Sequence, residues 1–473
     1  MLNNKIRHIH FIAICGTAMG SLAAMLKSQG YHITGSDEHV YPPMSTFLAN
    51  QGITIHKGFD AANLYPAPDL VVIGNAMSRG NPEVEIVLER KIPYTSLPEA
   101  LKHFFIQGKH SIVVSGTHGK TTTSSMIAWM LESAGKDPSF LIGGIPRNFN
   151  SGFKLGASNI FVIEGDEYDS AFFDKAAKFF HYMPDIVVLN NIEFDHADIY
   201  DNIDQIKLAF RRLINLIPGN GLLLAGTDDA NVEEMHQAAF SAVQSFGLNE
   251  NSYWRAVNIS YETDSTSFDV LREDTFWHRF SIPLSGDHNI RNALATIGTG
   301  VFHGLSPDEI QKGLSGYQSV VKRLELKATV DDIAIYDDFA HHPTEVKTTI
   351  EGLRHQKPDS RIWAVYEPRT STAKRKMMAQ AYASSFDAAD IIVIAPLHLP
   401  KKVNTDELLS VEQLVSDIRE RGNEAHYIDS VPGIVDYVAK KTRSGDQVLI
   451  MSNGAFGGIH DLLITKLQNE RNG

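Results

Sequence analysis

The chain has 473 residues, which at roughly 100–200 residues per domain predicts about three domains. Hydrophobic residues make up 43% of it and charged residues 21%, a balance that excludes a disordered or fibrous protein. Its 43 basic and 56 acidic residues leave a net charge of −13, so no nucleic-acid partner is expected, because phosphate neutralisation needs a basic surface. The single cysteine, Cys15, excludes an internal disulfide and fits the cytoplasm, the expected location. No apolar run reaches the ~18 residues of a membrane span, so no membrane partner is expected.

Short β-rich runs alternate with helical stretches, which predicts an α/β fold with parallel sheets and crossover helices. The first block, residues 1–108, opens with a strand at 7–15, a glycine turn and a helix to about residue 29, followed by strands at 31–35 and 70–73. The second block, residues 109–316, contains a strand at 111–114, a helix at about 120–133, strands at 160–163, 186–189 and 221–224, an antiparallel stretch at about 246–284, and a helix at about 289–302. The third block, residues 317–473, alternates strands at 333–336, 361–365, 391–394 and 447–450 with helices.

The strongest motif is Gly116-Thr117-His118-Gly119-Lys120-Thr121-Thr122, which lies between an apolar strand and a helix. This is the context of a phosphate-binding loop, in which glycines let backbone N–H groups face a phosphate and the helix N-terminus adds positive potential. In that role Lys120 would reach the β- and γ-phosphates of ATP, and the Thr121 hydroxyl would hold Mg²⁺. The general pattern asks for a glycine at position 114, where this chain has Val114.

Polar segments follow the next two strands of the same block. Glu164-Gly165-Asp166-Glu167 comes directly after the strand at 160–163, and Asn190-Asn191-Ile192-Glu193-Phe194-Asp195-His196 follows the strand at 186–189. Carboxylates at the carboxyl end of a strand beside a phosphate loop are placed to hold Mg²⁺. We therefore expect Glu164 and His196 near the phosphates, although a solvated acidic loop has the same composition.

The glycine turn of the first block, Gly16-Thr17-Ala18-Met19-Gly20, does not match the dinucleotide pattern G-x-G-x-x-G in any register. Asp37 lies near the distance at which a Rossmann fold places a ribose-binding acid. The first block is therefore expected to bind a nucleotide-linked substrate, and a dinucleotide dehydrogenase is disfavoured.

Three polar loops of the third block each follow a strand: Asp337-Asp338-Phe339-Ala340-His341-His342-Pro343, Glu367-Pro368-Arg369-Thr370-Ser371 and Ser452-Asn453-Gly454-Ala455-Phe456-Gly457-Gly458. Ligands of an open α/β sheet bind outside the carboxyl ends of the strands, which favours a site here. Ordinary turns use the same residue types, so the pattern alone favours a ligand-binding site and plain turns equally.

With these motifs together, the chain resembles the Mur ligases, the ATP-dependent amide-bond enzymes of bacterial cell-wall synthesis, over its full length. The phosphate loop of that family is Gly-Thr-x-Gly-Lys-Thr-Thr, which residues 116–122 match. The resemblance implies a Rossmann-like domain for the UDP-substrate over residues 1–108, a central P-loop ATPase domain over 109–316, and a Rossmann-like C-terminal domain for the amine over 317–473.

Further stretches resemble particular branches of the family. His118 within the loop and the segments 164–167, 288–292 and 337–345 resemble members that join L-alanine to UDP-N-acetylmuramate. Segments 36–45, 74–81 and 452–460 resemble members that attach a salvaged tripeptide, L-Ala-γ-D-Glu-meso-diaminopimelate, in one step. The implied reaction is tripeptide ligation through an acyl phosphate, with L-alanine ligation as the alternative.

The resemblance also implies roles for individual residues. Lys120 would contact the transferring phosphoryl group, and Thr121, Glu164 and His196 would hold Mg²⁺, with Lys120 and His196 counted as catalytic. The remaining roles are adenine binding by His288, Asn289 and Asn292, nucleotide contacts from Arg323 and Asp338, UDP-sugar binding by Gly16, Thr17, Gly20 and Asp37, a lactyl-carboxylate contact from His118, and peptide binding by Arg369 and Asn453.

Two other classes share part of these motifs. A phosphate-loop kinase or NTPase switch would transfer or hydrolyse phosphate without depending on a UDP-sugar. A nucleotide-sugar oxidoreductase would bind NAD in the first block, which the failed glycine pattern disfavours. The sequence pattern does not indicate which oligomeric state the protein has.

Overall fold

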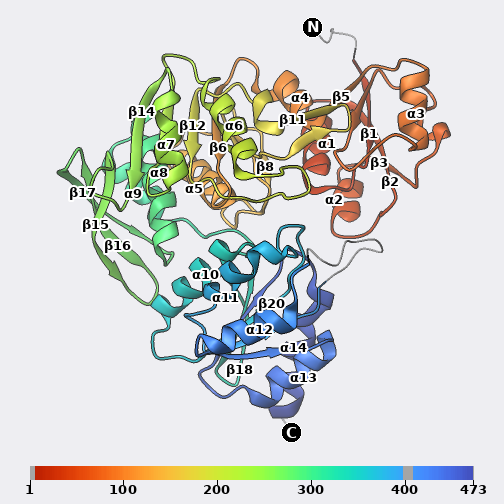
Figure 1. Cartoon of the computed structure of the whole chain (residues 1–473). Coiled ribbons are helices and arrows are strands. Elements are labelled where there is room, and N and C mark those ends of the chain that lie inside the picture. The colour runs from red at the N-terminus through yellow and green to blue at the C-terminus, as the bar shows by residue number, and fades with distance from the viewer. Residues whose placement is uncertain (1–5, 398–407, 472–473) are drawn as a thin grey trace.

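Within residues 6–397 and 408–471, which the computed structural model describes, the chain forms three large sheets, one in each predicted block. Figure 1 shows the first and central domains side by side and the C-terminal domain beneath them. The sheets lie inside the ranges 1–108, 109–316 and 317–473, whose exact limits stay predictions. None of the helices in the described ranges combines the length and hydropathy needed to cross a membrane.

The first domain is a five-stranded parallel sheet in the order β3-β2-β1-β4-β5. Its strands are β1 His8–Ile12, β2 His32–Asp37, β3 Thr54–Lys57, β4 Leu70–Ile73 and β5 Tyr94–Ser96, and its helices are α1 Thr17–Ser28, α2 Met44–Asn50, α3 Pro82–Glu89 and α4 Leu97–Leu101. Every residue of β4 is buried, as expected for a parallel strand covered on both faces.

The central domain carries a ten-stranded sheet in the order β17-β16-β15-β14-β13-β12-β6-β9-β7-β8. Its strands are β6 His110–Ser115, β7 Ser139–Leu141, β8 Phe153–Lys154, β9 Ile160–Gly165, β12 Ile186–Leu189, β13 Leu222–Gly226, β14 Ala242–Gly247, β15 Trp254–Tyr261, β16 Thr266–Arg272 and β17 Thr275–Ile282, beside a hairpin of β10 Asp169–Ala171 and β11 Asp174–Ala177. Its helices are α5 Lys120–Ser133, α6 Ile203–Ile214, α7 Ala230–Met235, α8 Asp287–Phe302 and α9 Pro307–Ser315. The predicted antiparallel stretch is confirmed by β15, β16 and β17.

Strand β6 lies between β9 and β12, and all three are parallel. The phosphate loop therefore leaves the middle of the sheet. Glu164, near the end of β9, and Asn190, directly after β12, flank it on the two sides. The neighbouring strand ends predicted from the sequence are thus brought together at one edge.

In the described residues, the sheet of the C-terminal domain has six strands in the order β18-β19-β23-β20-β21-β22. Strand β18 is antiparallel to β19, and the other neighbouring strands are parallel. The strands are β18 Glu325–Val330, β19 Ile333–Asp338, β20 Ile362–Tyr366, β21 Ile391–Ile394, β22 Glu424–Tyr427 and β23 Gln447–Met451, and the helices are α10 Pro343–Gln356, α11 Ala379–Ser385, α12 Val411–Glu420, α13 Val431–Lys441 and α14 Ile459–Arg471. Because β19, β23 and β20 are neighbours, their three polar loops leave the sheet side by side.

The first and central domains share a hydrophobic core, and the segment that leads to the C-terminal domain packs on the central domain. One hydrophobic cluster runs through the first and central domains, and Phe47 packs edge-on against Phe153 across their boundary. The residues just after position 316 still pack on the central domain: Tyr317 is 2% exposed, and Val320 forms a β-bridge with Pro146. This packing favours a domain boundary a few residues later than 316.

Candidate active site

The phosphate loop joins β6 to α5, as its motif predicts. Gly116 and Gly119 have φ angles of +125° and +81°, which only glycine adopts at little cost. A side chain at Gly116 would also place Cβ 2.9 Å from the carbonyl oxygen of Asn191. The loop is pinned further by the backbone N–H of His118, which donates to Asn191 Oδ1 at 2.8 Å. The first N–H groups of α5 have no partner within the helix, which makes this end an anion site.

Lys120, the first residue of α5, is folded back over the loop. Its Nζ donates to the carbonyl oxygens of Gly116 at 2.6 Å and Thr117 at 3.1 Å, and to Glu167 Oε2 at 3.1 Å. Burial alone would lower the pKa of Lys120, but the charges of Glu167 and Asp166 raise it above its ordinary value. The loop therefore presents a fixed cation.

The three predicted metal residues lie at two places: Thr121 is paired with Glu164, and His196 lies apart from them. Thr121 Oγ1 donates to Glu164 Oε2 at 3.1 Å, so two oxygen donors face each other beside the loop. His196 instead lies against Glu167, with 3.1 Å between Nε2 and Oε1, in a cluster completed by Asp166. Oxygen donors suit Mg²⁺, so Thr121 and Glu164 fit this ion. Glu167 is not one of the predicted metal ligands, yet its carboxylate contacts both predicted catalytic residues, Lys120 and His196.

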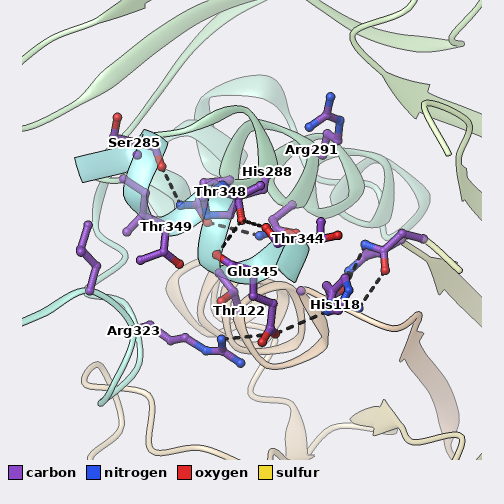
Figure 2. Close-up of a pocket in the computed structure, with 18 of the residues that line it drawn as sticks. His118, Thr122, Ser285, His288, Arg291, Arg323, Thr344, Glu345, Thr348 and Thr349 are labelled. Atoms are coloured by element: carbon purple, nitrogen blue, oxygen red, sulfur yellow. Dashed lines mark hydrogen bonds and ion pairs between the residues drawn. The ribbon is translucent and has the colours of Figure 1, made fainter. Parts of the chain in front are cut away.

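A cavity of about 410 Å³ opens beside the loop, between the central and C-terminal domains. Figure 2 shows its walls converging from α5, α8 and α10. The predicted residues that line it are His118, Gly119, Thr122, His288, Asn289, Asn292, Arg323 and Asp338. Its size falls within the range of small-molecule sites. The remaining loop residues, Gly116, Thr117, Lys120 and Thr121, are outside its lining.

The N-terminal half of α8 contacts α5 just after the phosphate loop. Asn292 Oδ1 accepts from Thr123 Oγ1 at 2.9 Å, and Asn292 Nδ2 donates to Asn289 Oδ1 at 3.2 Å. Burial, followed by the charges of Arg291 and Arg323, lowers the pKa of His288 to about 4. His288 therefore presents a neutral ring to the cavity near neutral pH.

The C-terminal domain supplies the opposite wall. Burial raises the pKa of Asp338 to about 6, although it accepts the backbone N–H groups of Leu324 and Ala340. Glu345 of α10 lies between two cations: its Oε1 is 3.7 Å from Arg323 Nη1 and 3.6 Å from His118 Nδ1 (Figure 2). The cavity thus places carboxylates next to the cations predicted to meet a nucleotide.

One group of polar contacts between these two domains centres on Glu193. His118 Nε2 is 3.3 Å from Glu193 Oε2, and His342 Nδ1 lies 3.4 Å from the same oxygen. Thr344 Oγ1 donates to Glu193 at 2.6 Å. Glu193 and Glu345 were not predicted as site residues. Both lie in motifs that the sequence singled out, but their partners lie on another domain, so no local spacing reveals the pairing.

The predicted peptide residues Arg369 and Asn453 belong to neighbouring loops. The guanidinium of Arg369 lies so close to Gly454 that a Cβ there would sit 2.5 Å from Nη1. Asn453 has a buried Oδ1 without a hydrogen-bond partner. Lys374 lies close enough for burial, and then the charge of Arg369, to lower its pKa. The structure therefore places Arg369 and Lys374 together at this sheet edge, with the Glu367 carboxylate 3.9 Å from Arg369 Nη1.

The same segment touches the loop that carries His196. The backbone N–H of Ala197 donates to Thr372 Oγ1 at 3.3 Å, and Arg375 Nη2 donates to the carbonyl oxygen of Ala197 at 3.2 Å. The C-terminal loops after β20 therefore lie against the acidic edge of the central sheet.

In the first domain, Gly16 precedes α1, where Thr17 begins the helix. Asp37 Oδ2 accepts the backbone N–H of Cys15 at 2.9 Å, which ties the end of β2 to this turn. A Cβ on Gly20 would lie 2.4 Å from Met44 Sδ, so this glycine allows α1 to pack against α2. Among the described residues, no hydrogen bond or ion pair joins Gly16, Thr17, Gly20 or Asp37 to the phosphate loop.

Family models match three stretches that follow the three sheets. The model described as Mur ligase family, catalytic domain, matches residues 8–108, the Mur ligase middle domain matches residues 114–300, and the Mur ligase, glutamate ligase domain, matches residues 322–454.

Similar proteins match over nearly the full length. The chain is 42% identical over 462 residues to UDP-N-acetylmuramate–L-alanyl-γ-D-glutamyl-meso-2,6-diaminoheptandioate ligase of Escherichia coli (strain K12), covering 97% of this chain and 98% of that protein. It is 35% identical over 453 residues to UDP-N-acetylmuramate–L-alanine ligase of Acetivibrio thermocellus, covering 95% and 94%. The crystal structure of a murein peptide ligase from Psychrobacter arcticus 273-4 is similar with a TM-score of 0.72 and 36% identity, covering 98% of this chain and 99% of that one.

Proposed function

Since the chain belongs to the Mur ligase family of ATP-dependent, ADP-forming ligases, we propose that it joins UDP-N-acetylmuramate to the tripeptide L-Ala-γ-D-Glu-meso-diaminopimelate. The observation that carries this substrate choice is the 42% identity, over 97% of the chain, to a ligase named for these two substrates. Identity to the L-alanine ligase of Acetivibrio thermocellus is 35%. The proposed role is the recycling of murein peptides in the cytoplasm, where ATP is available.

A carboxylate does not condense with an amine in neutral water unless it is activated. Phosphorylation of the UDP-N-acetylmuramate carboxylate by ATP gives an acyl phosphate, which the amine of the peptide attacks while phosphate leaves. Catalysis of the first step is mostly positioning and charge neutralisation. In this proposal the N–H groups of the loop 116–122 hold the phosphates, and Lys120 contacts the phosphoryl group that moves.

The oxygen donors of Thr121 and Glu164 support a Mg²⁺ site beside the loop, where the ion would neutralise phosphate charge. Burial raises the pKa of Glu164, so its negative charge is costly without a cation. His196 shares Glu167 with Lys120, which supports a position close to the transferring group. We propose that Glu167 positions both of these residues.

The nucleotide would lie in the cavity between the domains. The neutral ring of His288 and the amides of Asn289 and Asn292 suit an adenine, which offers neutral donors and acceptors. Arg323 and Asp338 would reach the nucleotide from the C-terminal domain.

The two other substrates would bind on either side of the nucleotide. We propose UDP-sugar binding at Gly16, Thr17, Gly20 and Asp37, with His118 near the lactyl carboxylate. A tripeptide with several carboxylates needs cationic partners, and Arg369 and Lys374 beside Asn453 would supply them. Contacts from Thr372 and Arg375 to Ala197 support delivery of the peptide amine to the acidic edge.

The test is ADP release by the purified chain with UDP-N-acetylmuramate and either the tripeptide or L-alanine. We expect the tripeptide to exceed L-alanine by well over tenfold in kcat/KM, a difference of more than about 1.4 kcal/mol in transition-state binding. Equal efficiency with L-alanine would overturn the substrate choice and favour L-alanine ligation. ADP release that does not depend on UDP-N-acetylmuramate would overturn the proposed ligase reaction itself.

Arg369→Ala tests the peptide site separately. It should raise KM for the tripeptide while leaving ATP binding close to that of the wild type, because Arg369 lies outside the lining of the nucleotide cavity. The matched control is Arg421→Ala, since Arg421 is an exposed cation of the same domain that pairs with Asp387. Equal effects of the two substitutions would contradict the placement of the peptide.

A further inference from the structure

Two tyrosines connect the His196 loop (residues 190–202) to the acidic segment at the end of β9 (residues 164–169). Tyr168 belongs to the acidic segment, and its hydroxyl donates to Asp198 Oδ2 in the His196 loop. Tyr200 belongs to the His196 loop, and its hydroxyl donates to the backbone carbonyl oxygen of Glu167 at 2.7 Å. The two hydrogen bonds therefore run in opposite directions between the same two segments.

These bonds lie next to the contact between His196 and Glu167. His196 Nε2 is 3.1 Å from Glu167 Oε1. The ring of Tyr168 also packs edge-on against the imidazole of His196, with the ring centroids 5.0 Å apart and the planes at 82°. Tyr168 therefore touches the ring of His196 itself, whereas Tyr200 holds the backbone of the residue with which His196 pairs.

Few polar contacts set the position of one segment relative to the other. Within the described part of the chain, the Tyr168, Tyr200 and His196 contacts are the hydrogen bonds that join residues 164–169 to residues 190–202. Removal of either tyrosine hydroxyl therefore removes one of three such bonds and leaves the bond of His196 itself in place.

The backbone at His196 needs support from its surroundings. Its φ angle is +55°, in the left-handed region that residues other than glycine adopt rarely and at a cost. Such a conformation persists where the surrounding structure holds it, and it is concentrated in functional sites. The carbonyl oxygen of His196 accepts the backbone N–H groups of Ile199 at 2.9 Å and Tyr200 at 3.0 Å. The turn that orients His196 thus ends at one of the two tyrosines.

We propose that Tyr168 and Tyr200 are positioning residues, which fix the His196 imidazole against the Glu167 carboxylate. Since Lys120 contacts the same carboxylate, they also set where His196 stands relative to the phosphate loop. The inference rests on the proposed function in one respect, namely that His196 acts beside the phosphoryl group that moves. A misplacement of about 1 Å in a catalytic group lowers the rate by about 10²-fold, so loss of a hydroxyl should slow phosphoryl transfer more than it weakens substrate binding.

The first measurement is spectroscopic and needs no turnover. The full chain is prepared with isotope-labelled histidine, and the nuclear magnetic resonance signals of the His196 ring are assigned from their loss in His196→Gln. We expect Tyr168→Phe and Tyr200→Phe each to shift these signals. The matched control is Tyr437→Phe, because the Tyr437 hydroxyl is 2.8 Å from His426 Nε2, between α13 and β22 of the C-terminal domain. Unchanged His196 signals in either variant would overturn the role of that tyrosine, and equal shifts in the control would overturn both.

The second measurement is the rate of ADP formation in a single turnover with UDP-N-acetylmuramate and the tripeptide at saturation. We expect Tyr168→Phe and Tyr200→Phe to slow it by at least about tenfold, with KM for each substrate close to that of the wild type and no change in Tyr437→Phe. A higher KM with an unchanged single-turnover rate would mean that the tyrosines contribute to binding and would overturn the proposal. Absence of ADP formation by the wild type would contradict the proposed function instead, and the His196 signals would still decide the positioning role.

A double-mutant cycle tests whether Tyr168 acts through Asp198. Tyr168→Phe keeps the ring against His196 and removes the hydroxyl alone, and Asp198→Ala removes the acceptor of that hydroxyl. The double variant should be no slower than the slower single variant, because both substitutions break the same bond. Asp198→Asn keeps an acceptor oxygen and should retain more of the rate than Asp198→Ala. Additive losses in the cycle would overturn the role given to the Tyr168 hydroxyl.

Discussion

Replacing Lys120 by methionine tests the phosphate loop at the atom where charge moves. Methionine keeps much of the side-chain volume but removes the ammonium, which now contacts two loop carbonyls and Glu167 Oε2 at 2.6–3.1 Å. Loss of one preorganised contact to developing charge typically lowers kcat by about 10²–10³, or roughly 2.7–4 kcal/mol. We expect that loss in ADP release at saturating substrates, with a smaller change in KM for ATP.

The same substitution should also reduce stability. Glu167 is 1% exposed, and without Lys120 its remaining charged partner at close range is His196 at 3.1 Å. Breaking a buried ion pair by removing one partner costs about 3–5 kcal/mol. Kinetics must therefore be measured well below the melting temperature of the variant. Adding Glu167→Gln should recover part of the melting temperature, because it removes the unpaired charge, without restoring turnover.

The control is Lys178→Met. Lys178 Nζ is 2.6 Å from Asp166 Oδ2, in the same acidic segment, but Lys178 is not part of the phosphate loop. We expect it to retain kcat within about tenfold of the wild type, because it makes no phosphoryl contact. Turnover of Lys120→Met within tenfold of the wild type, or equal losses in both variants, would refute the role given to Lys120.

Three further substitutions test other parts of the site and the fold. Glu164→Gln should raise the Mg²⁺ concentration needed for half-maximal ADP release, and an unchanged requirement would exclude it as a ligand. Gly119→Ala should weaken ATP binding measured by calorimetry, because φ is +81° and the new Cβ would lie 2.9 Å from Asn292 Oδ1. Its control is Gly135→Ala, where φ is +72° and no atom lies within 4 Å of the new Cβ. The control measures the backbone strain alone, which costs about 1–2 kcal/mol. Burial, and then nearby positive charge, lowers the pKa of His303 from 6.5 to about 4 in the folded state, so the unfolded chain takes up the proton first and stability should fall as pH drops from 6.5 to 4. His303→Gln should reduce that fall in melting temperature, and an identical pH profile would contradict the assignment.

Much of the site was predictable because its signals are local. The residues from Gly116 to Thr122 are contiguous, and the strand before them and the helix after them are each marked by their own pattern. The same holds for Asp338, Arg369 and Asn453, which follow or end strands that the sequence marks clearly. Parallel sheets bring strand ends to one edge, so knowing the strands was enough to group the loops.

The pairings between these loops were not predictable. The sequence motifs grouped Thr121, Glu164 and His196 around one Mg²⁺. The structure pairs Glu164 with Thr121, as that grouping expects, but places His196 against Glu167. All these carboxylates lie within four positions, and which one faces the helix depends on how β9 ends and how the next segment turns. The contact of Glu345 with His118 is more remote still, because it exists only when two separately folded domains are docked.

The contacts that dock the C-terminal domain onto the central domain use cations that are also expected to bind the substrates. The Glu345 carboxylate lies 3.7 Å from Arg323, which is expected to meet the nucleotide, and 3.6 Å from His118, which is expected to meet the carboxylate of the UDP-sugar. A bound triphosphate or carboxylate would compete with Glu345 for the same two cations, since like charges in a buried site repel strongly. Glu345 has a third partner, His341, whose Nδ1 is 3.2 Å from Oε2. The carboxylate would therefore exchange its cross-domain contacts for ligand contacts without losing every partner, which couples the position of α10 to the occupancy of the cavity.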